Sequence, residues 1–177
     1  MEHKIIFGGP VGAGKTTAIA AISDIPVVKT EAKPTDDTAQ IKATTTVAMD
    51  YGVLHLGDGG KVHLYGTPGQ ERFSFMWDIL SMGGMGLVLL LDNTRKDPLA
   101  DLEFYLDSFK GLIGKSAVVI GVNRMETKPR PGLYTYLTKL EQLGLKVPLF
   151  EVDPRQRQDV KMLMLALLAM LDPGVQR

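Results

Sequence analysis

The sequence predicts an α/β domain in three layers, in which helices cover both faces of a mixed six-stranded sheet with one antiparallel edge strand. Short β-rich runs alternate with helical patterns along the 177 residues, as βαβ units require. The runs at 87–91 and 118–122 are apolar throughout, as expected for strands covered on both faces. This length suits one domain, which we expect to span residues 1–177.

Local patterns then give the elements in chain order. The sequence Gly57-Asp58-Gly59-Gly60 reads as a hairpin turn, so the strands on either side of it run antiparallel. The segment 23–45 is polar, contains proline and is weakly periodic; a loop of that length is usually functional or disordered. We expect strands at 3–7, 50–56, 61–65, 86–92, 117–123 and 147–152, and helices at 15–22, 100–112, 133–143 and 160–171.

Composition excludes several classes of protein. Twenty Lys and Arg balance twenty Asp and Glu, so no net field attracts nucleic acid or an acidic membrane, and we expect no nucleic-acid partner. Cysteine is absent, which excludes disulfides, thiolate metal sites and thiol-linked lipids. The longest apolar run, 162–171, is shorter than the ~20 residues that span a bilayer. With no signal-peptide pattern and Glu2 in place of a myristoylated glycine, we expect a cytoplasmic protein without a stable membrane anchor.

A phosphate-binding motif follows the first strand. Residues 9–16 fit G-x-x-x-x-G-K-[ST] between the strand at 3–7 and the helix that begins at Lys15. Glycines let the backbone N–H groups point inward, and the helix N-terminus adds partial positive charge. A glycine-rich turn without a ligand would not need Gly-Lys-Thr here. The residues predicted to hold the phosphates are Gly9, Pro10, Val11, Gly12, Ala13, Gly14, Lys15, Thr16 and Thr17.

Within this P-loop (residues 9–16), two side chains have distinct chemistry. Lys15 is expected to reach the β- and γ-phosphates, and the Thr16 hydroxyl to bind Mg²⁺. The motif by itself does not choose between GTPases, ATPases and nucleotide kinases.

Later segments resemble the boxes of Ras-superfamily small GTPases, in the same order and over essentially the whole chain. Gly66-Thr67-Pro68-Gly69-Gln70-Glu71 resembles the second switch, and Thr44-Thr45-Thr46 precedes a strand as in the first switch. Asn123-Arg124-Met125-Glu126 resembles the N-K-x-D guanine box, and Asp153-Pro154-Arg155 stands where the family has its S-A-K loop. The Pro-Gly-Gln of the second switch looks most similar to the prokaryotic MglA-like group.

The resemblance implies a GTP-binding switch protein that hydrolyses GTP slowly and uses GTP/GDP and Mg²⁺. It implies that Gln70 orients the attacking water, that Gly69 senses the γ-phosphate and that Thr46 joins Thr16 on the metal. The base would be held by Asn123, Arg124, Glu126 and the Pro154–Arg155 loop. It further implies a protein effector or activating protein, such as a roadblock-domain protein, that reads the segments 29–47 and 66–82.

Three departures from the family pattern carry expectations of their own. Gly66 replaces the aspartate that holds a metal-bound water, so we expect weaker Mg²⁺ dependence. Val11 is a branched side chain in place of the usual glycine, so we expect slow hydrolysis. Glu126 and Arg124 replace Asp and Lys, which makes selectivity between GTP and ATP the least secure feature of the site.

Two other functions stay open. A P-loop kinase would need arginine-rich lid segments, and the stretch 93–111 offers only Arg95. A nucleotide-bound interaction module with negligible turnover is compatible with Val11 and Gly66. Asp92, which ends a central strand near the expected nucleotide, is interpreted as a structural cap of the following loop.

Overall fold

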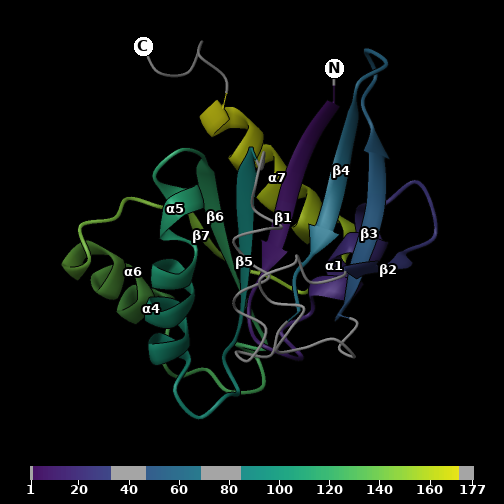
Figure 1. Ribbon diagram of the computed structural model, residues 1–177. Coiled ribbons are helices and arrows are strands. Elements are labelled where there is room, and N and C mark those ends of the chain that lie inside the picture. The colour runs from purple at the N-terminus through teal and green to yellow at the C-terminus, as the bar shows by residue number, and fades with distance from the viewer. Residues whose placement is uncertain (1, 33–46, 69–84, 172–177) are drawn as a thin grey trace, which may run out of the picture.

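A computed structural model describes residues 2–32, 47–68 and 85–171, which are drawn in colour in Figure 1. Its strands are β1 (Glu2–Gly8), β2 (Val28–Ala32), β3 (Val47–His55), β4 (Lys61–Gly66), β5 (Gly86–Asp92), β6 (Ala117–Asn123) and β7 (Leu149–Glu151). Its helices are α1 (Lys15–Ile22), α4 (Pro98–Ser108), α5 (Lys110–Ile113), α6 (Leu133–Gln142) and α7 (Arg157–Leu171).

The strands form one mixed sheet in the order β2-β3-β4-β1-β5-β6-β7. The expected α/β class and the antiparallel strand are confirmed, but the six-strand count is wrong: the described residues contain seven strands. The antiparallel strand, β3, is also not at the edge, because β2 pairs with its outer side. The strand β2, with the sequence Val-Lys-Thr-Glu-Ala, has no apolar run. It lies at the edge of the sheet and pairs through its backbone with β3.

Helices cover both faces of the sheet, as Figure 1 shows. On one face, α1 and α7 contribute to a core that includes Phe7, Leu90 and Leu163. On the other face, α4, α5 and α6 contribute to a core that includes Leu89, Ile120 and Tyr105. Successive residues of β5 and β6 alternate between these two cores. Every residue of both strands is buried, which confirms the interpretation of their apolar runs.

The helix expected at 100–112 is in fact two helices. It begins earlier, at Pro98, because the Asp97 carboxylate caps it by accepting a hydrogen bond from the Ala100 amide at 3.0 Å. It stops at Ser108, and Phe109 turns its ring under β1, where a Cβ at Gly8 would lie 2.9 Å from the Phe109 ring. The short helix α5 follows this buried aromatic residue.

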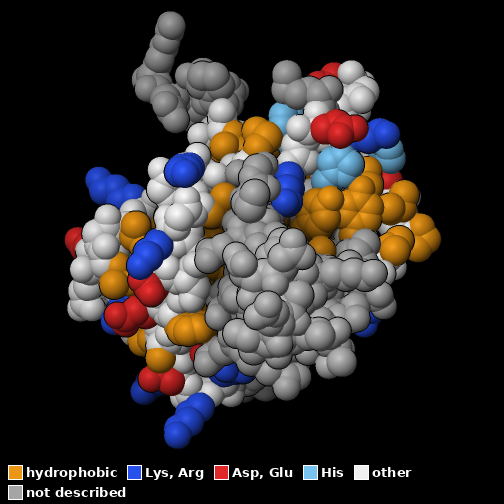
Figure 2. All heavy atoms as spheres, in the orientation of Figure 1, with side chains coloured by type: hydrophobic (Ala, Val, Ile, Leu, Met, Phe, Trp, Pro, Cys, Tyr) orange, Lys and Arg blue, Asp and Glu red, His pale blue; other side chains and the backbone are white. Residues whose placement is uncertain are grey.

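Figure 2 shows hydrophobic side chains gathered beside histidine over β3 and β4. Tyr51 stacks on His63, with ring centroids 5.9 Å apart, and lies 5.1 Å from the Tyr65 ring. Cross-strand aromatic pairs of this kind stabilise the hairpin. Within the described part of the chain, no helix is long and apolar enough to cross a membrane.

Candidate functional site

The loop between β1 and α1 has the backbone that the phosphate motif requires. Gly9 and Gly14 have φ angles of 135° and 105°, which side-chain-bearing residues rarely adopt. A Cβ at Gly9 would also lie 2.0 Å from the carbonyl oxygen of Leu90, and one at Gly14 would lie 2.7 Å from the Pro154 ring. These glycines therefore let the loop lie directly against β5 and against the loop that contains Pro154.

Lys15 points back into the loop that precedes it. Its side chain is only 8% exposed, and Nζ donates to the carbonyl oxygens of Gly9 and Pro10 at 2.6 and 2.8 Å. Burial lowers the Lys15 pKa to about 8, the Asp50 charge opposes this shift, and the Arg95 charge adds to it. The result is an ammonium group held at the mouth of α1, where a phosphate would replace carbonyl oxygens as its partner.

Asp50 supplies a carboxylate next to Thr16 that sequence reasoning missed. The Thr16 hydroxyl donates to Asp50 Oδ2. Asp50 lies on β3 directly opposite Gly66 of β4, and a Cβ at Gly66 would lie 3.2 Å from the Asp50 Cβ. The carboxylate thus occupies the space that a side chain at position 66 would need. Counting back from the 57–60 turn gives this pairing, so hairpin register was the available signal.

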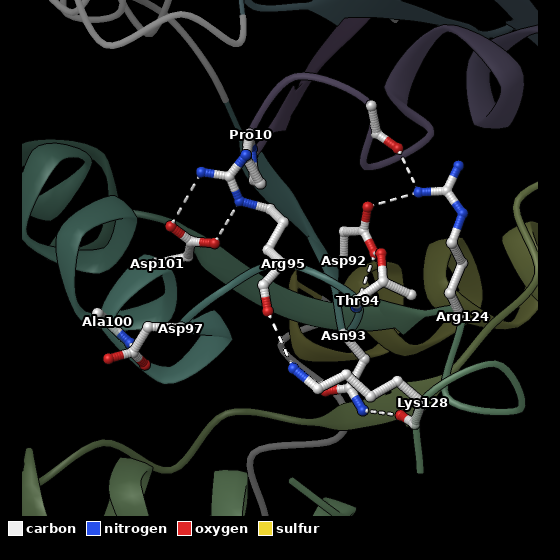
Figure 3. Close-up of polar contacts among 12 residues, drawn as sticks. Pro10, Asp92, Asn93, Thr94, Arg95, Asp97, Ala100, Asp101, Arg124 and Lys128 are labelled. Carbon is white, nitrogen blue, oxygen red and sulfur yellow. Dashed lines mark hydrogen bonds and ion pairs between the residues drawn. The ribbon is translucent and has the colours of Figure 1, made fainter. Parts of the chain in front are cut away.

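The loop after β6 is bonded to the P-loop. Asn123 is buried, and its Nδ2 donates to the Ala13 carbonyl at 3.1 Å. Arg124, which has a φ of 61°, donates from Nη1 to the Gly12 carbonyl at 2.9 Å and to Asp92 at 2.5 Å. Figure 3 shows Arg124 pointing toward Asp92. These contacts hold the expected base-binding loop in fixed relation to the expected phosphate-binding loop.

Asp92 and its neighbours form hydrogen bonds that hold the loops after β5 and β6 in place. The Asp92 carboxylate accepts from the Thr94 amide at 2.9 Å, so it caps the loop as interpreted from sequence, and it also anchors Arg124. Asn93 is fully buried; its Nδ2 donates to the Lys128 carbonyl at 2.5 Å, and its Oδ1 accepts from Tyr136 at 2.5 Å.

Arg95, the candidate lid arginine of a kinase, forms an ion pair within this part of the molecule. Its Nε lies 2.6 Å from Asp101 Oδ2 near the start of α4 (Figure 3). The Arg95 carbonyl in turn accepts from Lys128 Nζ at 3.1 Å. The residue therefore helps to tie the β5–α4 loop to the loop after β6.

A cleft of about 350 Å³ opens between these loops. Its lining includes Thr127 and Asp153, which sequence reasoning did not select. The residues that line it are Gly14, Thr17, Asn123, Arg124, Glu126, Thr127, Asp153, Pro154 and Arg155.

The predicted site residues divide into two groups. The P-loop, Asn123, Arg124, Glu126 and the Pro154–Arg155 loop come together around the cleft or directly behind it. Gln70, Gly69 and Thr46 lie outside the described residues, as does most of the two segments proposed to meet a partner. The roles assigned to these residues stay predictions.

Three relatives are similar to this chain over part of their own length. The GTP-binding nuclear protein GSP1 of Encephalitozoon cuniculi is 24% identical over 88% of this chain and 69% of its own. An uncharacterized protein of Methanocaldococcus jannaschii is 34% identical over 53% of each. The Ras-related protein Rab-18-B of Danio rerio is 27% identical over 60% of this chain and 48% of its own. The chain thus spans about half the length of the last two relatives.

A sequence model of one protein family matches residues 26–172, a span that begins after the P-loop. Together with the loop geometry, these similarities support a nucleotide-binding, P-loop GTPase-like protein. Because the match covers most of the sequence, the chain belongs to the family described as conserved hypothetical ATP binding protein.

Proposed function

We propose that this protein binds GTP or GDP with Mg²⁺ in the cleft and hydrolyses GTP slowly. The observation that carries the proposal is the bonding of Asn123 and Arg124 to the P-loop carbonyls, which holds the expected base-binding loop against the expected phosphate-binding loop beside the cleft. The Glu126 carboxylate, which lines the cleft, suits the N–H donors of guanine. The names of two relatives, GTP-binding and Ras-related, support GTP, whereas the family description mentions ATP.

Lys15 and the backbone amides of the P-loop would hold the triphosphate. Among the described residues, the Lys15 ammonium group donates to two carbonyl oxygens. Phosphate oxygens carry full negative charge and make stronger, charge-assisted hydrogen bonds. Replacing the carbonyl oxygens with phosphate oxygens as partners of Lys15 therefore favours nucleotide binding.

The residues beside Lys15 fit Mg²⁺, which prefers oxygen ligands and usually binds through one or two protein groups plus phosphates. Because the Thr16 hydroxyl hydrogen points to Asp50, its oxygen lone pairs stay available to a cation. Asp50 would orient this hydroxyl and accept hydrogen bonds from metal-bound water. When bound, Mg²⁺ neutralises charge on the phosphate oxygens.

Slow turnover and partner binding complete the proposal. Val11 is 56% exposed on the P-loop, where its branched side chain would crowd a water-positioning group such as Gln70. Relay of the nucleotide state to a protein partner, of the roadblock-domain kind, rests on the resemblance of the 29–47 and 66–82 segments to switch loops. The rival with negligible turnover draws its support from the same exposed valine.

Fluorescent GTP, GDP and ATP titrated into nucleotide-free protein would test binding, and single-turnover hydrolysis would test turnover. Lys15→Ala should abolish affinity for all three, because it removes the ammonium group that points into the loop. The matched control is Lys110→Ala, which removes an exposed lysine at the start of α5 that pairs with Asp107 of α4. Absence of affinity of the unaltered protein for every purine triphosphate would refute the proposal.

A further inference from the structure

The two candidate bases differ in the hydrogen-bonding groups on their edges. Guanine presents the O6 acceptor beside N1 and N2 donors, whereas adenine presents an N6 donor beside an N1 acceptor. A site selects guanine when it places a donor at O6 and an acceptor at N1 and N2, because a mismatched base leaves buried polar groups unpaired. Selectivity at the base end of the cleft therefore depends on the donors and acceptors that line it.

The backbone of the 153–156 loop offers no spare donor. The Asp153 amide donates to Asp159 Oδ2 at 2.8 Å, and the Arg155 amide donates to Asp153 Oδ1 at 3.0 Å. The Gln156 amide donates to the Asp153 carbonyl at 2.9 Å. Pro154, between them and against the P-loop, has no N–H at all. An O6 oxygen at this loop thus meets no backbone donor.

Two polar side chains that line the cleft are held in place by bonds to the P-loop and β5. Asn123 donates to Ala13, and Arg124 donates to Gly12 and Asp92. The Thr17 and Thr127 hydroxyls can donate or accept, so they match either base. On the 153–156 loop itself, the cationic donor that lines the cleft is Arg155.

Arg155 is exposed yet fixed in orientation. Its side chain is 75% exposed, and Asp153 binds it at both Nε and Nη2, at 2.9 and 2.8 Å. A guanidinium carries five N–H donors, so this fork leaves hydrogens on Nη1 and Nη2 for a ligand. An arginine oriented in advance loses less entropy when it binds.

Glu126 provides the complementary acceptor. The bond to Asp153 is the main cause of the raised Arg155 pKa, and the Glu126 charge adds to it, which places the carboxylate within electrostatic range of the guanidinium. A carboxylate can accept from N1 and N2 of guanine together, but from only N6 of adenine. The pair therefore matches the guanine edge more fully.

We propose that Arg155 selects guanine by donating from its guanidinium to O6, with Asp153 as the positioning residue that orients it. This inference rests on the proposed function, since it concerns the base of the nucleotide bound in the same cleft. A side chain is the donor to O6 in this proposal because the 153–156 loop has no free backbone N–H: Pro154 lacks one and the other amides are already bonded.

Four triphosphates distinguish bases that carry the O6 and N1–H edge from bases that lack it. GTP and ITP carry O6; 2-aminopurine riboside triphosphate and ATP do not. Equilibrium affinities are measured for the unaltered protein, Arg155→Ala and Asp153→Asn. We expect Arg155→Ala to lower the affinity for GTP and ITP about tenfold, because one charge-assisted hydrogen bond at an exposed site is lost. The affinities for ATP and the 2-aminopurine nucleotide should change by less than about threefold. Asp153→Asn should also weaken the binding of GTP and ITP relative to the other two nucleotides, but by a smaller factor.

Arg157→Ala is the matched control, because this neighbouring arginine donates to the Ala21 carbonyl and does not line the cleft; its affinities should stay unchanged. An equal loss of affinity for all four nucleotides in Arg155→Ala would show that Arg155 attracts phosphate. An unchanged GTP affinity would show that Arg155 has no contact with the base. Either result overturns the inference. Failure of the unaltered protein to bind any of the four would instead overturn the proposed function.

Discussion

The carboxylate of Asp50 leads to a quantitative prediction about Mg²⁺. Asp50→Asn keeps the shape of the side chain but removes the negative charge from the group that accepts a hydrogen bond from the Thr16 hydroxyl. Groups that orient a metal ligand are typically worth about 10- to 100-fold in metal affinity. Asp50 is half-buried and acts at an open site, so we expect the lower end, about tenfold or roughly 1.4 kcal/mol.

The assay is retention of a fluorescent guanine nucleotide as Mg²⁺ is titrated. For Asp50→Asn the half-saturating Mg²⁺ concentration should rise about tenfold, while nucleotide binding at saturating Mg²⁺ persists. Asp58→Asn is the control, since Asp58 caps the hairpin turn by accepting from the Gly60 amide at 2.9 Å. An unchanged midpoint would refute the assignment. Loss of binding at every Mg²⁺ concentration would show instead that Asp50 maintains the loop itself.

The pairing of Asp50 with Gly66 allows a rescue experiment. The double variant Asp50→Gly with Gly66→Asp moves the carboxylate to the directly opposite position on β4. It should recover most of the lost Mg²⁺ affinity. Gly66→Asp alone should be destabilising, because its Cβ would lie 3.1 Å from the Ile19 side chain and 3.2 Å from the Asp50 Cβ. If the double variant behaves like Asp50→Gly alone, the two positions are not interchangeable and the reasoning fails.

Three further predictions concern the loop and its chemistry. Gln70→Leu should slow single-turnover GTP hydrolysis without weakening GTP binding; unchanged turnover would contradict the role assigned to Gln70. The Lys15 pKa of about 8 lies below its ordinary 10.5, so between these values the unfolded chain holds a proton that the folded chain has lost. Urea unfolding of the nucleotide-free protein should therefore show stability rising with pH across this window, by up to about 3 kcal/mol relative to Lys15→Met; a flat difference would exclude a buried, charged lysine. Gly9→Ala should cost about 3 kcal/mol or more by the same method, because its Cβ would lie 2.0 Å from the Leu90 oxygen, whereas Gly57→Ala, with open space around it, should be nearly neutral.

The sequence alone was sufficient for features that depend on local pattern. The continuous apolar runs of β5 and β6 predicted strands covered on both faces, because a strand alternates its side chains between two cores. The Gly-Lys-Thr motif predicted the loop between β1 and α1, because positive φ angles and an opening helix are properties of adjacent residues. The hairpin turn predicted the antiparallel pairing of β3 with β4.

Tertiary structure alone decided the features that join distant residues. The strand β2 has no apolar pattern and exists through its backbone pairing with β3. Asp50 becomes part of the candidate metal site only because register places it opposite Gly66, sixteen residues along the chain but adjacent in the sheet. The Asp153 amide is bonded only because the fold brings Asp159, at the start of α7, next to it. Residue type and spacing determine which chemistry a segment can offer, whereas the hydrogen-bond partners that consume or free each donor are fixed only when the chain has folded.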